Sequence, residues 1–169
     1  LFDLHNFFDN AKHYSLLNDK DVDLRYEALK RVFKGNSSLY IHANTVQGIK
    51  EGILFAKKYN IHKVIIVGAS ESWRILDFIK ENDVSIILNR IHSLPSSQDD
   101  NINQSFITPK LLKDSGILFC LDYHGDMERM GSRNLPFLAG TTINYGLSKE
   151  EALQLITLNP AKILGISHR

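Results

Sequence analysis

Residues 64–88 read VIIVGASESWRILDFIKENDVSIIL, two apolar runs separated by a segment of mixed polarity. The runs Val64–Val67 and Val84–Leu88 are rich in β-branched residues and lack clear polar alternation, which is typical of strands buried on both faces of a parallel sheet. Between them, apolar residues recur at helical spacing behind Ser70, which can cap a helix. These residues are Trp73, Leu76 and Ile79. The stretch therefore predicts a strand, a helix and a second strand.

The same alternation continues on both sides of this unit. Leu39–Ile41 and Ile117–Leu121 are two further apolar runs that indicate strands. The four runs begin at residues 39, 64, 84 and 117. Their intervals fit strand–helix units with one long loop inserted, so we expect four parallel strands alternating with helices.

Helical signals fill the remaining segments. Residues 9–33 predict a leading helix that is frayed or broken near Asn18, and Thr45 can cap the helix after the first strand. The pair Thr108-Pro109 predicts an N-cap followed by proline at the first helical position. Two closing helices are expected over 132–145 and 148–158, the second opened by a capping box from Ser148 to Glu151. We expect one domain over 1–169, with a leading helix in 1–35, four βα units in 38–122 and closing helices in 131–165.

Composition narrows the functional classes. The chain has 169 residues, 43% of them hydrophobic, and a net charge of +1. That balance argues against nucleic-acid and anionic-membrane partners, and no run has the length of a transmembrane helix. The single cysteine, Cys120, excludes an internal disulfide and a cysteine-based zinc site.

Two architectures fit four such units. Right-handed crossovers place the C-terminal ends of all four strands on one rim. The chain can therefore be half of a (β/α)8 barrel or a complete, open doubly wound sheet. In the open sheet, the turn at Ser70 would be the place for a phosphate.

In either architecture, ligands bind beyond the C-terminal ends of the strands, where several polar residues lie. His42 follows the first strand and could be a metal ligand, an acid or base, or a core-edge histidine. Arg90 and His92 follow the third strand, where they suit an anionic substrate group and proton transfer, and open a long loop. Asp122 and His124 follow the fourth strand, and Asp122 should need a cation or a hydrogen-bond donor.

Several motifs resemble those of the amidohydrolase superfamily, most closely its imidazolonepropionase-related branch. They are Ile41-His42-Ala43-Asn44, the run ending in Asp122, Arg133-Asn134-Leu135-Pro136-Phe137, and the tail from Gly146-Leu147-Ser148 through Asn159-Pro160-Ala161-Lys162 to Gly165. The resemblance implies that the chain is the C-terminal half of a TIM barrel, strands five to eight plus closing helices, truncated at both ends.

The resemblance also implies site residues. In that superfamily a metal is bound by a His-x-His pair after the first strand, histidines after the fifth and sixth, and an aspartate after the eighth. His42 matches the fifth-strand histidine, and Asp122 matches the eighth-strand aspartate that takes a proton from metal-bound water. The sixth-strand histidine has no counterpart, because Gly68 stands there.

By this resemblance the whole protein would hydrolyse a C–N bond, in an amide or cyclic imide, using water activated by a divalent metal such as zinc. Arg90, His92 and His124 would contact the small-molecule substrate. The alternative is a catalytically degenerate barrel relative that binds a small ligand or a partner.

Two further expectations follow from a half-barrel. The fragment alone should be catalytically silent, because it lacks the first-strand ligands. Its two outer strands should leave unpaired edges, which favours self-association of two halves into an approximate barrel, unless the leading helix or the loop after His92 covers them. The sequence does not indicate a cellular compartment.

Overall fold

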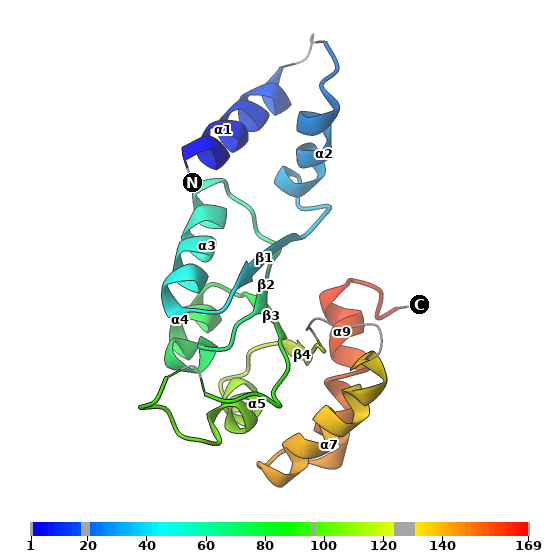
Figure 1. Cartoon of the computed structure of the whole chain (residues 1–169). Helices are drawn as coiled ribbons and strands as arrows, with labels where there is room; N and C mark the ends of the chain where they lie inside the picture. The colour runs from blue at the N-terminus through cyan, green and yellow to red at the C-terminus, as the bar shows by residue number, and fades with distance from the viewer. Residues whose placement is uncertain (1, 18–20, 96, 124–130, 169) are drawn as a thin grey trace.

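A computed structural model of the chain describes residues 2–17, 21–95, 97–123 and 131–168 (Figure 1). Four parallel strands form one sheet in the order β1-β2-β3-β4. They are β1 (Leu39–Ala43), β2 (Val64–Gly68), β3 (Ser85–Leu88) and β4 (Phe119–Leu121). The expected alternation of four parallel strands with helices is confirmed.

The crossover helices follow the sequence signals in part. Thr45 caps α3 (Val46–Lys58) by accepting a hydrogen bond from the Gly48 amide. Ser70 caps nothing, because a 3-10 turn (Ser72–Arg74) precedes the short α4 (Leu76–Glu81).

The predicted start of the next helix is wrong. α5 spans Gln104–Asp114, and Pro109 lies inside it rather than at its first position. The Thr108 hydroxyl donates to the Gln104 carbonyl one turn earlier, so it does not cap the helix. Gly116, with a φ of +74°, follows the helix end as expected.

The leading helix is interrupted between Leu16 and Leu24, close to the break expected near Asn18, whereas the closing segment is divided more finely than the sequence predicts. The leading segment forms two helices, α1 (Phe2–Leu16) and α2 (Leu24–Phe33), which extend beyond the β1 side of the sheet (Figure 1). Phe8 of α1 packs edge-on against Phe55 of α3, with ring centroids 4.8 Å apart. The closing elements are a 3-10 turn (Ser132–Asn134), α7 (Leu135–Asn144), α8 (Lys149–Gln154) and α9 (Leu158–Ile163). No helix in the described ranges is both long and apolar enough to cross a membrane.

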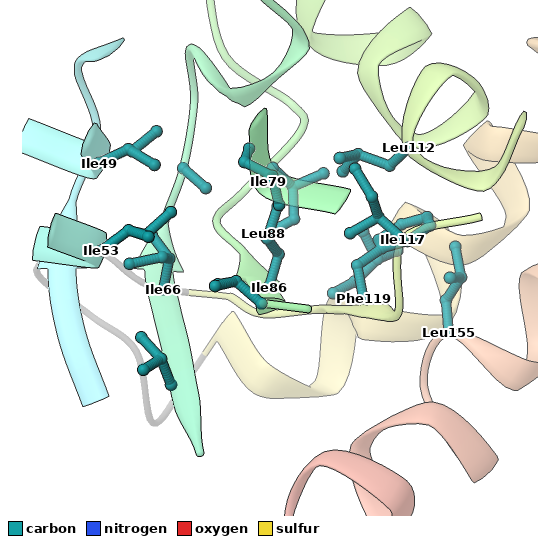
Figure 2. Close-up of a cluster of buried hydrophobic side chains, with 14 of the residues drawn as sticks. Ile49, Ile53, Ile66, Ile79, Ile86, Leu88, Leu112, Ile117, Phe119 and Leu155 are labelled. Atoms are coloured by element: carbon teal, nitrogen blue, oxygen red, sulfur yellow. The ribbon is translucent and has the colours of Figure 1, made fainter. Parts of the chain in front are cut away.

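The main core lies between the sheet and its crossover helices (Figure 2). Alternate strand residues, such as Ile66, Ile86 and Phe119, are at most 1% exposed. They meet buried residues of α3, α4, α5 and the closing segment. These are Ile49, Ile53, Ile79, Leu112 and Leu155. The opposite face carries a smaller cluster in which Ile163 of α9 packs with Ile65 and Cys120.

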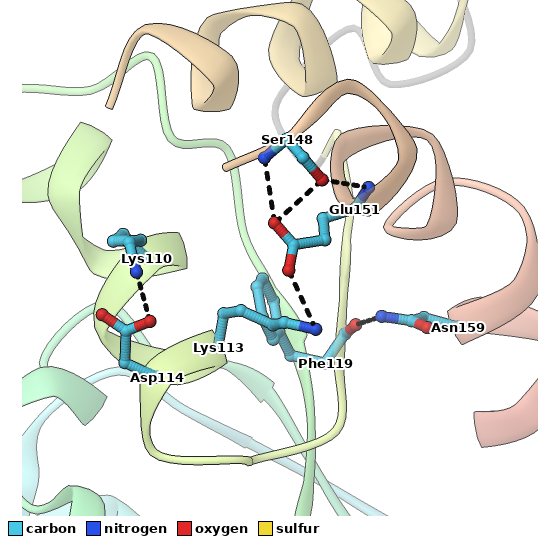
Figure 3. A network of polar contacts seen from close by, with 7 residues as sticks. All are labelled: Lys110, Lys113, Asp114, Phe119, Ser148, Glu151 and Asn159. Atoms are coloured by element: carbon cyan, nitrogen blue, oxygen red, sulfur yellow. Dashed lines mark hydrogen bonds and ion pairs between the residues drawn. The ribbon is translucent and has the colours of Figure 1, made fainter. Parts of the chain in front are cut away.

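Polar contacts attach the closing helices to the rest of the fold (Figure 3). The capping box is present: Ser148 accepts from the Glu151 amide, and the Glu151 carboxylate accepts from the Ser148 amide. The same carboxylate pairs with Lys113 of α5 at 3.2 Å. Asn159 donates its side-chain amide to the Phe119 carbonyl at 2.8 Å. These contacts fix α8 and α9 against α5 and β4.

Candidate functional site

His42 and Asp122 lie at the same rim and on the same face of the sheet. Leu39, Ile41 and Ala43 pack toward the helices, so the alternation of the strand directs His42 to the opposite face. Phe119 and Leu121 also face the helices, which places Asp122 on the side of Cys120. His42 is exposed and Asp122 is half-buried. The geometry therefore agrees with a shared, inward-facing rim for these two residues.

Their strands are nevertheless the two outer ones. Three strand spacings separate β1 from β4, roughly 14 Å along the sheet, whereas two donors on one zinc ion lie within about 4 Å of each other. Within the described ranges no three His, Cys, Asp or Glu side chains gather closely enough to hold a metal ion. The Asp122 carboxylate accepts from the Tyr123 amide at 2.8 Å. His124 lies outside the described residues.

Gly68 occupies the position where the resemblance leads us to expect a histidine. Its φ of +102° is a conformation that side-chain-bearing residues rarely adopt. A Cβ placed there would lie 2.4 Å from Asn44 Oδ1 and 3.3 Å from the Ala43 carbonyl oxygen. The structure therefore explains the mismatch: the Asn44 side chain occupies the space that a residue at position 68 would need.

Hydrogen bonds join the turn after β1 to the turn after β2. The Ala69 amide donates to the Ala43 carbonyl at 2.8 Å, and the Glu71 amide donates to the Asn44 carbonyl at 3.0 Å. The Glu71 carboxylate accepts from the Val46 amide at 2.8 Å. The Ser70 hydroxyl also donates to the Asn44 carbonyl. Because this hydroxyl is engaged and only a three-residue 3-10 turn follows, the turn lacks the helix N-terminus that the phosphate hypothesis required.

The loop after β3 is anchored on two sides. Arg74 pairs with Asp100, whose side chain is only 5% exposed. His92 Nε2 lies 2.8 Å from Thr141 Oγ1 of α7, and its ring lies 5.8 Å from that of Phe106. Arg90 is exposed. The loop therefore holds His92 against α5 and α7.

Cys120 lies on the same face of the sheet as Asp122, but its thiol is unreactive. Burial, reinforced by the nearby Asp122 carboxylate, raises the pKa of its thiol to about 12. A thiol with so high a pKa is almost entirely protonated near neutral pH and is therefore a poor nucleophile.

Comparison with solved structures supplies a match for the fold. The chain has the fold of half a TIM-barrel amidohydrolase. The matching structure is the crystal structure of an amidohydrolase from Thermotoga maritima MSB8, with a TM-score of 0.79 and 21% sequence identity. The match covers 97% of this chain and 44% of that one, so the chain spans less than half of that protein's length. No protein-family model and no curated protein matches the chain.

Two rim contacts escaped the sequence reasoning. Asn44 stood within a quoted motif, but its packing against Gly68 joins residues 24 positions apart. Thr141 looked like an ordinary helical residue, yet it is the partner of His92. For the contact between Asn44 and Gly68, the only local signal in the sequence was a glycine directly after an apolar run.

Proposed function

We propose that this chain is part of a metal-dependent hydrolase of the amidohydrolase type, acting on C–N bonds in amides or cyclic imides. The imidazolonepropionase-related branch is the specific relative that we infer from the sequence motifs. The observation that carries the proposal is the placement of His42 and Asp122 on one rim and one face. The fold likeness to the Thermotoga maritima amidohydrolase supports it.

The chain offers too few donors to form the centre by itself. A catalytic zinc site needs about three protein ligands and an open position for water. The strands of His42 and Asp122 lie roughly 14 Å apart along the sheet, so these two residues would reach one metal only across the curved rim of the closed barrel. The remaining ligands would come from the other half of that barrel. A divalent metal bound there would lower the pKa of its water to about 7. Asp122 would then be the group that holds the proton, with its carboxylate oriented by the Tyr123 amide.

The remaining residues would contact the substrate. The exposed Arg90 guanidinium suits an anionic group of a small molecule. His92 is already oriented by Thr141, so it would serve as a fixed hydrogen-bonding group. His124 stays a candidate from the sequence alone.

Metal analysis of the whole protein tests this proposal. We expect stoichiometric divalent metal in the wild type and its loss in both His42→Ala and Asp122→Asn. His62→Ala is the matched control, because His62 is exposed and precedes β2 at the opposite end of the sheet. Retention of metal in both rim variants would contradict the ligand assignment.

A second candidate function is a degenerate barrel that binds a small ligand or partner without catalysis. The packing of Asn44 against Gly68 favours it, because a side chain at this expected ligand position would be strained and would require Asn44 to move. In that case the wild-type whole protein would contain no stoichiometric metal, and the rim variants would not differ from it.

A further inference from the structure

The two residues that follow β4 send their side chains to opposite faces of the sheet. Tyr123 packs with the main core on the helix side, whereas Asp122 lies by alternation on the face that bears Cys120. Because the two residues are adjacent, a contact that fixes the Tyr123 ring behind the sheet also fixes the peptide group next to Asp122. Tyr123 can therefore influence Asp122 without lying on the same face.

Two hydrogen bonds determine how Asp122 is held. Its backbone amide donates to the Leu88 carbonyl at 2.9 Å, which continues the pairing of β4 with β3. Its Oδ1 atom accepts from the Tyr123 amide at 2.8 Å. The first bond fixes the residue to the sheet, and the second sets the direction of the carboxylate, because it joins the carboxylate to the next peptide group. The direction of the carboxylate therefore depends on the position of the Tyr123 backbone.

Gly131 leaves the space that the Tyr123 ring occupies. Gly131 is buried and directly precedes the 3-10 turn that leads into α7. A Cβ built on it would overlap Cε1 and Cδ1 of the ring and would lie 2.9 Å from Cζ. These atoms belong to a rigid ring and not to the end of a flexible chain, so a side chain at position 131 would displace the whole ring. The ring thus connects the end of β4 to the start of the closing helices.

The backbone conformation of Gly131 does not require glycine. Its φ of −79° and ψ of −24° are helical values that any residue adopts. Gly68, by contrast, has a φ of +102°. At position 131 the Tyr123 ring is therefore the feature that excludes a side chain. Alanine at this position perturbs the contact with the ring and leaves the local backbone unstrained.

We propose that Gly131 and Tyr123 are positioning residues for Asp122: the ring, held against Gly131, fixes the peptide group that orients the carboxylate. The role of Asp122 as a metal ligand rests on the proposed function, whereas the coupling of the three residues does not. Groups that hydrogen-bond or orient a metal ligand commonly contribute 10–100-fold to metal affinity. If the ring only filled the core, its displacement would lower stability and leave the Asp122 carboxylate unchanged.

Hydrogen exchange of single amides, measured by NMR on the metal-free whole protein, tests the coupling. Gly131→Ala should speed exchange of the Tyr123 amide by about tenfold or more, the effect of losing one hydrogen bond to a carboxylate. The Asp122 amide, still bonded to Leu88, should keep its wild-type rate. Tyr123→Phe keeps the ring and should match the wild type. Gly140→Ala is the matched glycine control, because no atom lies within 4 Å of a Cβ built there.

Tyr123→Ala gives an independent route to the same result. It removes the ring without adding a side chain to a filled space, so it decides the test if Gly131→Ala does not fold. We expect the same selective acceleration at the amide of residue 123. Unchanged exchange of that amide in Tyr123→Ala, or equal acceleration of the Asp122 amide, would overturn the proposal, since the ring would then hold either nothing or the whole strand end.

Zinc titration of the whole protein tests the consequence for the site. Gly131→Ala and Tyr123→Ala should weaken zinc binding by about 10–100-fold, whereas Tyr123→Phe and Gly140→Ala should bind as the wild type does. Wild-type affinity in a folded Gly131→Ala protein would overturn the positioning role. A wild type that binds no zinc would overturn the proposed function, and the exchange rates would still decide whether Gly131 and Tyr123 hold Asp122.

Discussion

Replacement of Gly68 by alanine should destabilise the fold, because this residue combines an unusual backbone conformation with a close neighbour. At a φ of +102° an alanine incurs strain of about 1–3 kcal/mol. The contact with Asn44 Oδ1 involves the end of a flexible side chain and can relax by rotation, whereas the 3.3 Å approach to the Ala43 carbonyl involves backbone. We therefore expect a loss of about 2 kcal/mol in the free energy of unfolding, mostly from strain.

Thermal and urea unfolding followed by circular dichroism measures this loss. For a chain of this size, about 2 kcal/mol corresponds to a decrease in Tm of roughly 4–8 °C. The double variant Gly68→Ala/Asn44→Ala should lose less free energy of unfolding than the two single variants together, because the close contact is then absent.

Gly140→Ala is the matched control for the strain argument. Gly140 lies in α7 with no atom within 4 Å of a built Cβ, so alanine there should stabilise the helix by about 0.5–1 kcal/mol. If Gly68→Ala changed stability by less than about 0.5 kcal/mol, the scatter typical of neutral surface positions, the reasoning on position 68 would be wrong.

Three other predictions follow from the described contacts. Cys120 should resist iodoacetamide at pH 8 until urea unfolds the chain, because a pKa of about 12 leaves roughly one thiol in ten thousand ionised; mass spectrometry would show labelling only in denaturant. The Ser148 amide, the Lys113 ammonium and the Ser148 hydroxyl lower the pKa of Glu151, so its contribution to stability is present above its unfolded pKa and is lost as the pH falls through the lower folded value. The stability deficit of Glu151→Gln, measured by urea unfolding, should therefore shrink in acid. Phe119→Ala should lower the free energy of unfolding by about 3–5 kcal/mol, because the ring is 1% exposed and its removal leaves a cavity. A decrease below about 1 kcal/mol, measured by urea unfolding, would contradict that.

The strands were predictable from the sequence because burial on both faces imposes a continuous apolar run. The observed strands at Val64–Gly68 and Ser85–Leu88 begin within one residue of the runs that indicated them. Local side-chain signals worked where the partner was close in sequence. The capping box at Ser148 is the clearest case, since both of its hydrogen bonds lie within one helical turn.

The sequence-based predictions of helix boundaries failed where tertiary contacts outweigh local signals. Thr108 and Pro109 look like a helix start, but both are buried within α5, and packing there overrides the preference of proline for a first turn. The expected helix over 148–158 breaks after Gln154, and the Leu155 carbonyl just beyond it bonds to β4. No property of residues 148–158 alone reports that distant partner.

In the candidate site, too, some residues could be predicted from the sequence, whereas the role of another depends on a distant contact. His42 and Asp122 could be found because each directly follows an apolar run, and such positions reach the rim whatever the fold around them. The role of Gly68 depends on Asn44, a residue of another turn. Since the hydrogen bonds from Ala69 and Glu71 fix that turn against the first one, a histidine at position 68 would carry the strain of the positive φ and would require the Asn44 side chain to move. If a metal binds at this rim as we propose, His42 and Asp122 are the ligands that this chain would supply, which is why the rim variants, and not a restored histidine, are the informative test.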